Sequence, residues 1–554
     1  MIYRIFQFTG GINTKIGDFT LIAGGGVNWY RLSPFTLWNY EYRDDMFERY
    51  PWDPEQTAWN KYNVYYASQN IARDARWGNT GTQGFILNGK NLPFGLGFDL
   101  LYGKTDNSGG YQTYLAKTPK NMMAGRLKKS IKTHEFGGNW MSQFGSSDGI
   151  GFNKIRQDII TTDARLNFTK FKIFYEVGVG RFQDGVVDES TRIFLNGNSN
   201  TRADGTKIVG DSISSTIGRD FGWGKNFTDM FNNNRAFQFQ FDFKKEWFNF
   251  PLMVQAFSIG KSVVNVNSQV LNSANNHAIG IPANVGTVYD ITTLTGAITD
   301  IGQMTNNRQG INIKHENTYG KLKVSFGIAA SQEIQNDTVN SKNQISYWHQ
   351  VNAFTRSRFT YFENSTGPYG RITSIFRRTY EQYTITDAVV NYKKSYNTMN
   401  LSLKYKFTLF NKEIILSNYN LYNSVTDHFS PIATFSNAAF LRTFYEEAMI
   451  FVNIHPKVTL LGFYGIEKVW GNQRMNLADA NGNEIVNASG KQIYDPNGLT
   501  IDQTGHGYGF GIDYDFAGRA GLYLRQRFFD NKDVHFTKDT FSGYESTVEL
   551  KIFF

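Results

Sequence analysis

The sequence predicts an all-β protein, a transmembrane antiparallel up-and-down β-barrel of roughly 18 to 20 strands that forms one domain over residues 1–554. Three observations predict this fold: long runs of alternating apolar and polar residues, alternating short and long connections, and an aromatic-rich composition without an apolar block. Aromatic residues make up 16% of the chain. No window of 18 consecutive apolar residues exists, since even 278–304 is interrupted by Asp290 and Asp300, which excludes membrane-spanning helices. The absence of cysteine excludes disulfides, thiolate metal sites and cysteine nucleophiles.

The alternation is clearest between Phe237 and Phe243, where every second residue is Phe and the residues between are Gln238, Gln240 and Asp242. Similar runs cover 171–179, 399–409 and 508–516. Side chains of a strand point alternately to its two faces, so each run has one apolar and one polar face. A tilted strand needs about ten residues to cross a bilayer, against about five or six in a soluble sheet. The length of the runs favours a membrane barrel over a soluble sandwich.

The connections between the runs alternate in length. Short turns are predicted at 167–170, 247–250, 318–321, 410–413, 455–457 and 515–519. Long polar stretches are predicted at 33–81, 184–234, 262–308, 335–395 and 471–505. Short periplasmic turns and long extracellular loops are typical of membrane barrels. A barrel of this size is wide enough for a lumen that holds water or a plug.

The last strand carries the residues of a family resemblance. Val548, Leu550, Ile552 and Phe554 lie on one face of it. This pattern resembles the C-terminal signal by which barrel-insertion machinery recognises bacterial outer-membrane barrels. With the length and the long loops, the chain resembles the barrel portion of TonB-dependent transporters or a large porin, and its Asn/Tyr/Lys-rich composition looks like that of Bacteroidota. The resemblance implies a bacterial outer-membrane location, contact with outer-membrane lipid and lipopolysaccharide, and a plug domain upstream of Met1.

The start of the chain predicts a strand over 1–9, a turn at 10–15 and a second strand over 18–30. If this turn is periplasmic, the first strand runs downward and an upward strand should precede it. We therefore expect the native protein to contain residues upstream of Met1; the alternative is a strand miscounted elsewhere in the chain.

Polar faces of the predicted strands supply candidate pore-lining residues. These are Arg165, Glu176, Gln238, Gln240, Asp242, Lys244, Lys404 and Lys406. We expect them to face an aqueous lumen, because the apolar faces must look outward at lipid.

Aromatic residues gather in the predicted loop 36–66. They include Trp38, Tyr40, Tyr42, Trp52 and Trp59, with carboxylates and guanidinium groups among them. Aromatic faces beside such groups suit carbohydrate or peptide ligands through stacking and hydrogen bonds. The alternatives are an extracellular loop packed on itself over the barrel mouth and a contact surface for a partner, such as an outer-membrane or surface lipoprotein.

Two basic groups stand out. The first is Arg356, Arg358, Arg371, Arg377 and Arg378, and the second is Lys117, Lys120, Arg126, Lys128, Lys129 and Lys132. Facing the lumen, such groups would favour anionic solutes. The alternatives are contact with lipopolysaccharide phosphates and simple solvation. A nucleic-acid partner is not expected, because the charges are dispersed and no recognised module accompanies them.

Signals for catalysis are weak. Gly103-Lys104-Thr105 matches the end of a phosphate-binding loop, but Phe98 stands where that motif requires glycine. Asp427 and His428 form a single acid–histidine pair in a predicted loop. We expect no enzymatic activity, no catalytic residues, no cofactor and no metal site.

Three hypotheses remain for the function: a channel or transporter, a scaffold subunit and a barrel enzyme. A channel or transporter predicts a polar lumen, whereas a scaffold subunit of a secretion, surface-display or barrel-assembly complex predicts a lumen filled by folded-in loops. We favour transport, by analogy with other barrels of this size.

Overall fold

The structure is a computed structural model. It describes residues 7–28, 31–38, 58–67, 82–105, 121–146, 153–186, 219–221, 226–260, 262–263, 265, 268–271, 304–334, 337–339, 344–350, 379–385, 390–392, 394–427, 440–472, 488–489, 500–518, 520–533 and 541–552.

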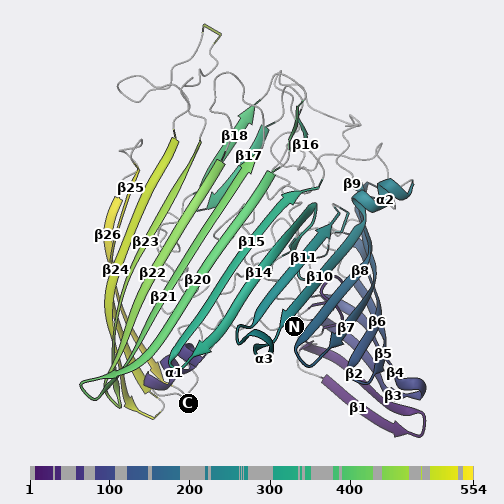
Figure 1. The fold of residues 1–554 in the computed structure, drawn as a ribbon, viewed down its shortest axis with the longest axis horizontal. Helices are drawn as coiled ribbons and strands as arrows, with labels where there is room; N and C mark the ends of the chain where they lie inside the picture. Colours follow the sequence, from purple (N-terminus) through teal and green to yellow (C-terminus); the bar gives the residue numbers. More distant parts are fainter. Residues whose placement is uncertain are drawn as a thin grey trace.

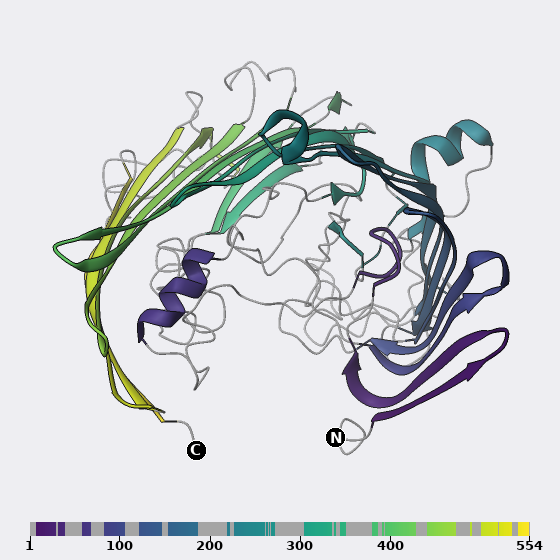
Figure 2. The same cartoon turned by 60° about the horizontal axis from the view of Figure 1, so that its bottom comes forward.

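Nineteen long strands form one antiparallel up-and-down sheet, as the sequence predicts. They are β1 (Gln7–Thr14), β2 (Gly17–Asn28), β3 (Thr82–Leu92), β4 (Leu96–Thr105), β5 (Asn121–Ile131), β6 (His134–Ser146), β7 (Asn153–Asn167), β8 (Phe171–Val186), β10 (Arg235–Phe243), β11 (Leu252–Ile259), β14 (Arg308–Tyr319), β15 (Leu322–Glu333), β20 (Lys394–Leu409), β21 (Lys412–Asp427), β22 (Phe440–His455), β23 (Val458–Asn472), β24 (Thr500–Ala517), β25 (Ala520–Asp533) and β26 (Phe541–Ile552). The strands lie side by side and strongly tilted in Figure 1. In Figure 2 the sheet curves round most of a ring, with the two chain ends on either side of the remaining opening.

The other elements are short. Strand β9 (Arg219–Phe221) pairs with the end of β8 and continues the line of β10. The small strands are β12 (Val270–Leu271), β13 (Met304–Thr305), β16 (Asp337–Val339), β17 (Gln344–Gln350), β18 (Thr379–Ile385) and β19 (Val390–Tyr392), and the helical segments are α1 (Ala58–Ala67), η2 (Pro93–Gly95), α2 (Phe227–Asn233) and α3 (Lys245–Phe248). None of the helices in the described part of the chain has the length and apolar character needed to cross a membrane.

The connections follow the predicted alternation. Between β20 and β21 only Phe410 and Asn411 intervene, with φ of 50° and 57°. Positive φ at both central residues gives the turn a twist that matches that of the flanking strands. Long connections follow β2, β8, β11, β15 and β23, so every long stretch predicted from the sequence joins two strands at the opposite end.

The first predicted turn is wrong in position. Gly10 and Gly11 lie inside β1, and the reversal occurs at Lys15 and Ile16. There the Thr14 hydroxyl donates to the Gly17 carbonyl at 2.8 Å and accepts from the Ile16 amide at 3.2 Å. The threonine hydroxyl satisfies backbone groups that the ladder leaves free at the turn, which is why the strand extends past the glycines.

The outer face of the sheet is apolar. Its exposed side chains include Phe85, Leu100, Tyr102, Leu127, Ile160, Val177, Phe237, Phe239, Ile311, Met399, Leu416, Ile450, Tyr508, Phe510 and Ile512. On β10 the Phe side chains point outward, while Gln238 is buried on the inner face, as the alternation predicts. Asn418, Asn420 and Glu446 are polar exceptions on the outer face of β21 and β22, where they hydrogen-bond to one another.

Replacing Phe239 by arginine tests the lipid-facing assignment of this surface. An arginine near the bilayer midplane costs about 2–4 kcal/mol. We expect Phe239→Arg to lower the free energy of unfolding by about that amount in phospholipid vesicles, measured by reversible urea unfolding. Phe410→Arg is the matched control, because Phe410 is 89% exposed in the β20–β21 turn and should tolerate the charge. Equal losses in the two variants would contradict the assignment.

Candidate functional site in the barrel lumen

A short piece of the long β2–β3 connection folds into the lumen. Residues 31–38, called the inward segment, form a tight turn in which the Leu32 amide donates to the Leu37 carbonyl at 2.8 Å. The hydroxyls of Ser33 and Thr36 lie 2.6 Å apart and hydrogen-bond across the turn. Leu32, Phe35 and Leu37 are almost fully buried. A segment of a polar connection is thus part of the interior of the barrel.

Glu176 anchors the inward segment to the wall. Its carboxylate accepts from the Ser33 hydroxyl at 2.5 Å, the Thr161 hydroxyl at 2.6 Å, the Gln238 amide at 3.2 Å and the Phe35 backbone amide at 3.4 Å. The side chain is fully buried, so these donors replace the water that the carboxylate loses. Two of the four come from the inward segment, which makes Glu176 the link between wall and turn.

Glu176 belongs to a row of polar side chains across neighbouring strands, called here the polar row. Its members are Arg126, Asn139, Asp163, Thr161, Glu176, Gln238, Gln255 and Asn312. Asn312 donates to Gln255 at 2.8 Å, and Gln255 donates to Gln238 at 3.1 Å. On the other side of Glu176, Asn139 donates to Thr161 at 3.2 Å and to Asp163 at 2.6 Å. Side-chain bonds thus link the inner wall from β5 to β14.

Arg126 carries the positive charge of the polar row. Its guanidinium donates to Asp163 at 2.9 Å and to Glu135 at 2.7 Å, and it reaches the Leu32 carbonyl of the inward segment at 3.5 Å. Arg126 is 4% exposed. The sequence places it in a basic group open to solute or solvent, whereas the structure makes it part of a buried ion-pair network. The carboxylates of β6 and β7, which face the same lumen, are the physical reason.

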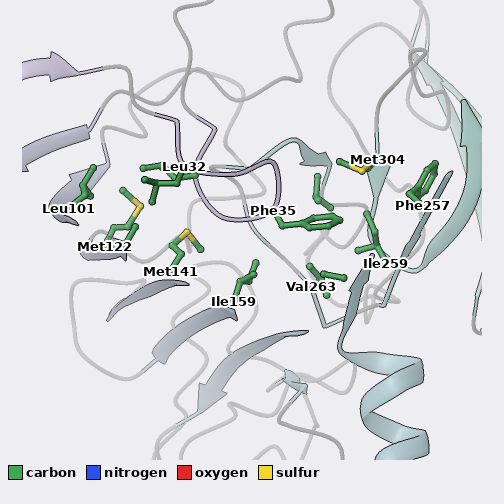
Figure 3. Close-up of a cluster of buried hydrophobic side chains, with 14 of the residues drawn as sticks. Leu32, Phe35, Leu101, Met122, Met141, Ile159, Phe257, Ile259, Val263 and Met304 are labelled. Atoms are coloured by element: carbon green, nitrogen blue, oxygen red, sulfur yellow. The ribbon is translucent and has the colours of Figure 1, made fainter. Parts of the chain in front are cut away.

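Above the polar row, toward the long-loop end, the inner wall is apolar. Leu32 and Phe35 pack with Leu101, Met122, Met141 and Ile159 of the wall (Figure 3). Phe257 and Ile259 of β11, together with Val263 and Met304, extend this cluster. In this part of the sheet the inner face carries apolar side chains, because these positions face the inward segment and not water.

The β11–β14 connection supplies a second folded-in piece. The Asn265 side-chain amide donates to the carbonyls of Phe35 at 2.7 Å and Thr36 at 2.6 Å. The Gln269 amide donates to the Pro34 carbonyl at 2.8 Å. Backbone carbonyls of the inward segment are thus satisfied from one side, while its amide and hydroxyl donors are satisfied by Glu176 from the other.

Helix α1 lies in the lumen at the short-turn end, although it also belongs to the β2–β3 connection (Figure 2). Trp59 donates to Glu413 at 2.6 Å, and the Tyr62 hydroxyl donates to Asp513 at 2.6 Å. Lys406 donates to Asn63 at 2.8 Å and pairs with Glu413 at 2.9 Å. These wall residues lie close to the short turns of β20, β21 and β24. The two described pieces of the β2–β3 connection, the inward segment and α1, therefore contact the wall at different heights of the lumen.

This position corrects the interpretation of the aromatic loop. Trp59 was expected at an extracellular mouth, but it is 5% exposed and packed near the opposite end. The centroids of its indole and of the Tyr62 ring lie 6.3 Å apart, and the Tyr62 ring packs at a tilt against Phe451 of the wall, with 4.3 Å between the ring centroids. Trp38 is half-buried with the Arg31 guanidinium 5.3 Å from its ring. Tyr40, Tyr42 and Trp52 lie outside the described residues.

The predicted pore-lining residues all occupy the inner face or its lower edge. Gln240 donates to Asp242 at 2.9 Å, and Arg165 lies 3.5 Å from Glu135. Lys404 is 5% exposed, and Lys244 caps the carbonyl of Thr169 in the β7–β8 turn at 3.2 Å. Their role in lining a solute path stays a prediction.

Two further sets of residues were singled out in the sequence, the C-terminal pattern and the first basic group, and the structure describes only part of them. Val548, Leu550 and Ile552 are exposed on the outer face of β26, and their role as an insertion signal stays a prediction. Phe554, and the basic group formed by Arg356, Arg358, Arg371, Arg377 and Arg378, lie outside the described residues. No group of His, Asp or Glu among the described residues could hold a metal ion.

Comparisons with known proteins give distant matches only. No family model and no curated protein matches the chain. Among solved structures, it is similar to OmpT of Vibrio cholerae, with 9% identity, 83% of this chain and 98% of that chain covered, and a TM-score of 0.25. The anion-selective porin from Comamonas acidovorans gives 11% identity, 81% and 91% coverage and a TM-score of 0.24. The outer membrane channel DcaP of Acinetobacter baumannii gives 9% identity, coverage of 87% of this chain and 98% of that chain, and a TM-score of 0.25. At this level the matches carry no argument, and the barrel architecture stands on the strand pairing.

Truncating Glu176 to alanine tests its role as the anchor. The change leaves the donors of Ser33, Thr161 and Gln238 without their shared acceptor. We expect amide hydrogen exchange of residues 31–38 to become at least about tenfold faster, since unmade buried hydrogen bonds cost about 1–3 kcal/mol. Mass-spectrometric exchange measures this locally. Gln240→Ala, on the same inner face but bonded to Asp242, should leave the segment protected. Unchanged exchange in Glu176→Ala would mean that the apolar contacts alone hold the turn.

Proposed function

We propose that the protein is a non-enzymatic outer-membrane channel that passes small polar solutes through a lumen narrowed by its own β2–β3 connection. The outer-membrane location rests on the apolar outer face and on the exposed C-terminal strand pattern. The observation that carries the channel proposal is the polar row, which lines the inner wall and holds the inward segment through Glu176. Such an element, fixed inside the barrel, would narrow the lumen without the need for a separate plug domain.

A second form of the transport proposal is a transporter related to TonB-dependent receptors from a Bacteroidota-type outer membrane, in which a plug, and not the β2–β3 connection, controls passage. Its partners would be outer-membrane lipid, lipopolysaccharide and the barrel-insertion machinery. Carbohydrates, peptides and anionic ligands are the candidate solutes that the sequence suggests. The aromatic residues Trp59 and Tyr62 of α1 are buried against the wall, so they are not available to stack on a carbohydrate.

A scaffold subunit of a secretion, surface-display or barrel-assembly complex is the second candidate, with surface lipoproteins as partners. One observation favours the scaffold. The lumen holds the inward segment, the piece of the β11–β14 connection that contains Asn265, and α1. A scaffold has no need of a solute path, so its lumen can be filled throughout.

Single-channel conductance in planar bilayers tests the channel proposal. One variant replaces residues 32–37 by a Gly/Ser linker of equal length. Because pore conductance rises with free cross-section, we expect this variant to conduct at least about threefold more than the wild type. The control replaces residues 227–232 in the same way, because α2 lies outside the wall.

The outcomes separate the hypotheses. Wild-type openings of full porin size that do not change in the variant would contradict a constriction at the inward segment. Silence of both proteins, shown to be folded and inserted, would refute the channel and favour the scaffold.

A further inference from the structure

The outer wall carries a group of guanidinium side chains at the long-loop end of β7, β8 and β10. Asp158 accepts from Arg156 at 2.8 Å and from Arg181 at 2.6 Å, and the Ser142 hydroxyl donates to it at 2.6 Å. Asp158 lies in register with Arg181 and two residues from Ile160, which is 54% exposed on the outer face. This ion-pair group therefore lies on the lipid side of the wall, above the apolar surface.

Arg235 extends the group on the next strand and has only neutral partners. It donates to the Ser258 hydroxyl at 2.8 Å and to the Phe231 carbonyl at 3.2 Å, and it reaches Gln309 at 3.5 Å. Arg235 is in register with Val179, so it lies diagonally across from Arg181 on the same face. No carboxylate pairs with it among the described contacts. The surface therefore presents more positive than negative charge.

The height of Arg235 matches the edge of a bilayer core. Strand β10 has 9 residues below and including Arg235. A strand of that length covers about 30 Å, or roughly 23 Å of height at a tilt of about 40°. The apolar band of membrane barrels is about 25 Å tall. At the lower end of the band, Trp247 and Phe250 form the partly exposed aromatic border that such bands carry.

Helix α2 places two exposed aromatic rings beside Arg235. Phe227 is 75% exposed and Phe231 is 53% exposed, and their rings stack at 6.2 Å. The Arg235 guanidinium lies 4.7 Å from the Phe231 ring. The helix projects outward from the wall in Figures 1 and 2. Exposed aromatic rings next to cationic groups are the composition of a surface that lies in the headgroup region of a membrane.

We propose that Arg235, Arg181 and Arg156, with the Phe227–Phe231 pair, form a binding site for the phosphate group of a lipopolysaccharide molecule in the outer leaflet. Guanidinium groups bind phosphate oxygens with charge-assisted hydrogen bonds. The acyl chains of the same molecule would cover Phe237 and Val177 directly below. The proposal rests on the outer-membrane location proposed above, but not on a channel activity.

Binding of purified lipid A to the folded barrel in detergent micelles tests the site, with native mass spectrometry as the readout. The wild type should retain lipid A, and Arg235→Gln should bind it at least tenfold more weakly. Arg235→Lys should recover part of the affinity, because the charge is kept. Lys457→Gln is the control, since Lys457 is exposed in the β22–β23 turn at the opposite end.

Two comparison probes are used. One is lipid A from which the phosphate groups have been removed, and the other is inorganic phosphate. The proposal expects weak binding of the dephosphorylated lipid and little competition by inorganic phosphate. Equal binding of the two lipids, full competition by free phosphate, or wild-type affinity in Arg235→Gln would each overturn it. Conductance of Arg235→Gln in bilayers should equal that of the wild type, so loss of lipid A binding and failure of the channel proposal are distinguishable.

Discussion

The whole structure depends on the requirement that backbone amides and carbonyls inside a membrane find partners within the protein. The long strands meet this requirement through one continuous antiparallel ladder, from β1–β2 to β25–β26. The ladder fixes the register, and the register fixes the face on which each side chain lies. A shift of β10 by one residue against β8 would move Gln238 to the lipid side and the Phe residues of β10 into the lumen, and Glu176 would lose its Gln238 donor. The apolar outer face and the inner polar row are therefore two consequences of the same strand pairing.

The inner face then creates a second requirement, because charged and amide groups turned away from water need partners of their own. Some of these partners lie on other strands of the wall, as in the hydrogen bonds from Arg126 to Asp163 and from Gln255 to Gln238. Others come from the chain folded into the lumen. Glu176 takes donors from Ser33 and Phe35, and Asn265 gives donors back to the carbonyls of the same turn. The inward segment is held on both sides by polar bonds and capped above by apolar packing. This explains how a short turn stays fixed inside a wide barrel.

The sheet could be predicted from the sequence because its signal is local: period-2 alternation over ten or more residues, and turns such as that at Phe410 and Asn411. The contents of the lumen could not, since they depend on contacts between residues far apart in the chain. Ser33 and Glu176 are separated by 143 residues, and Tyr62 and Asp513 by 451. The apolar residues Leu32, Phe35 and Leu37 around Pro34 were the available signal for the inward segment, and they stand at the edge of a stretch that otherwise reads as a polar loop. Arg126 was misplaced for the same reason, because its partners lie on other strands.

The two edges of the sheet follow from strand parity. Successive strands of the meander alternate in direction, and with 19 of them β1 and β26 run the same way. Among the described residues no strand pairs with the outer edge of either. In lipid, each unpaired backbone group along such an edge costs several kcal/mol, so the edges cannot both face the bilayer. Direct pairing of β1 with β26 would be parallel, with slanted and slightly weaker hydrogen bonds. An antiparallel seam instead requires an odd number of further strands between them. In such a seam, the strand that pairs with β1 must alternate apolar and polar residues in phase with Phe8 and Thr9.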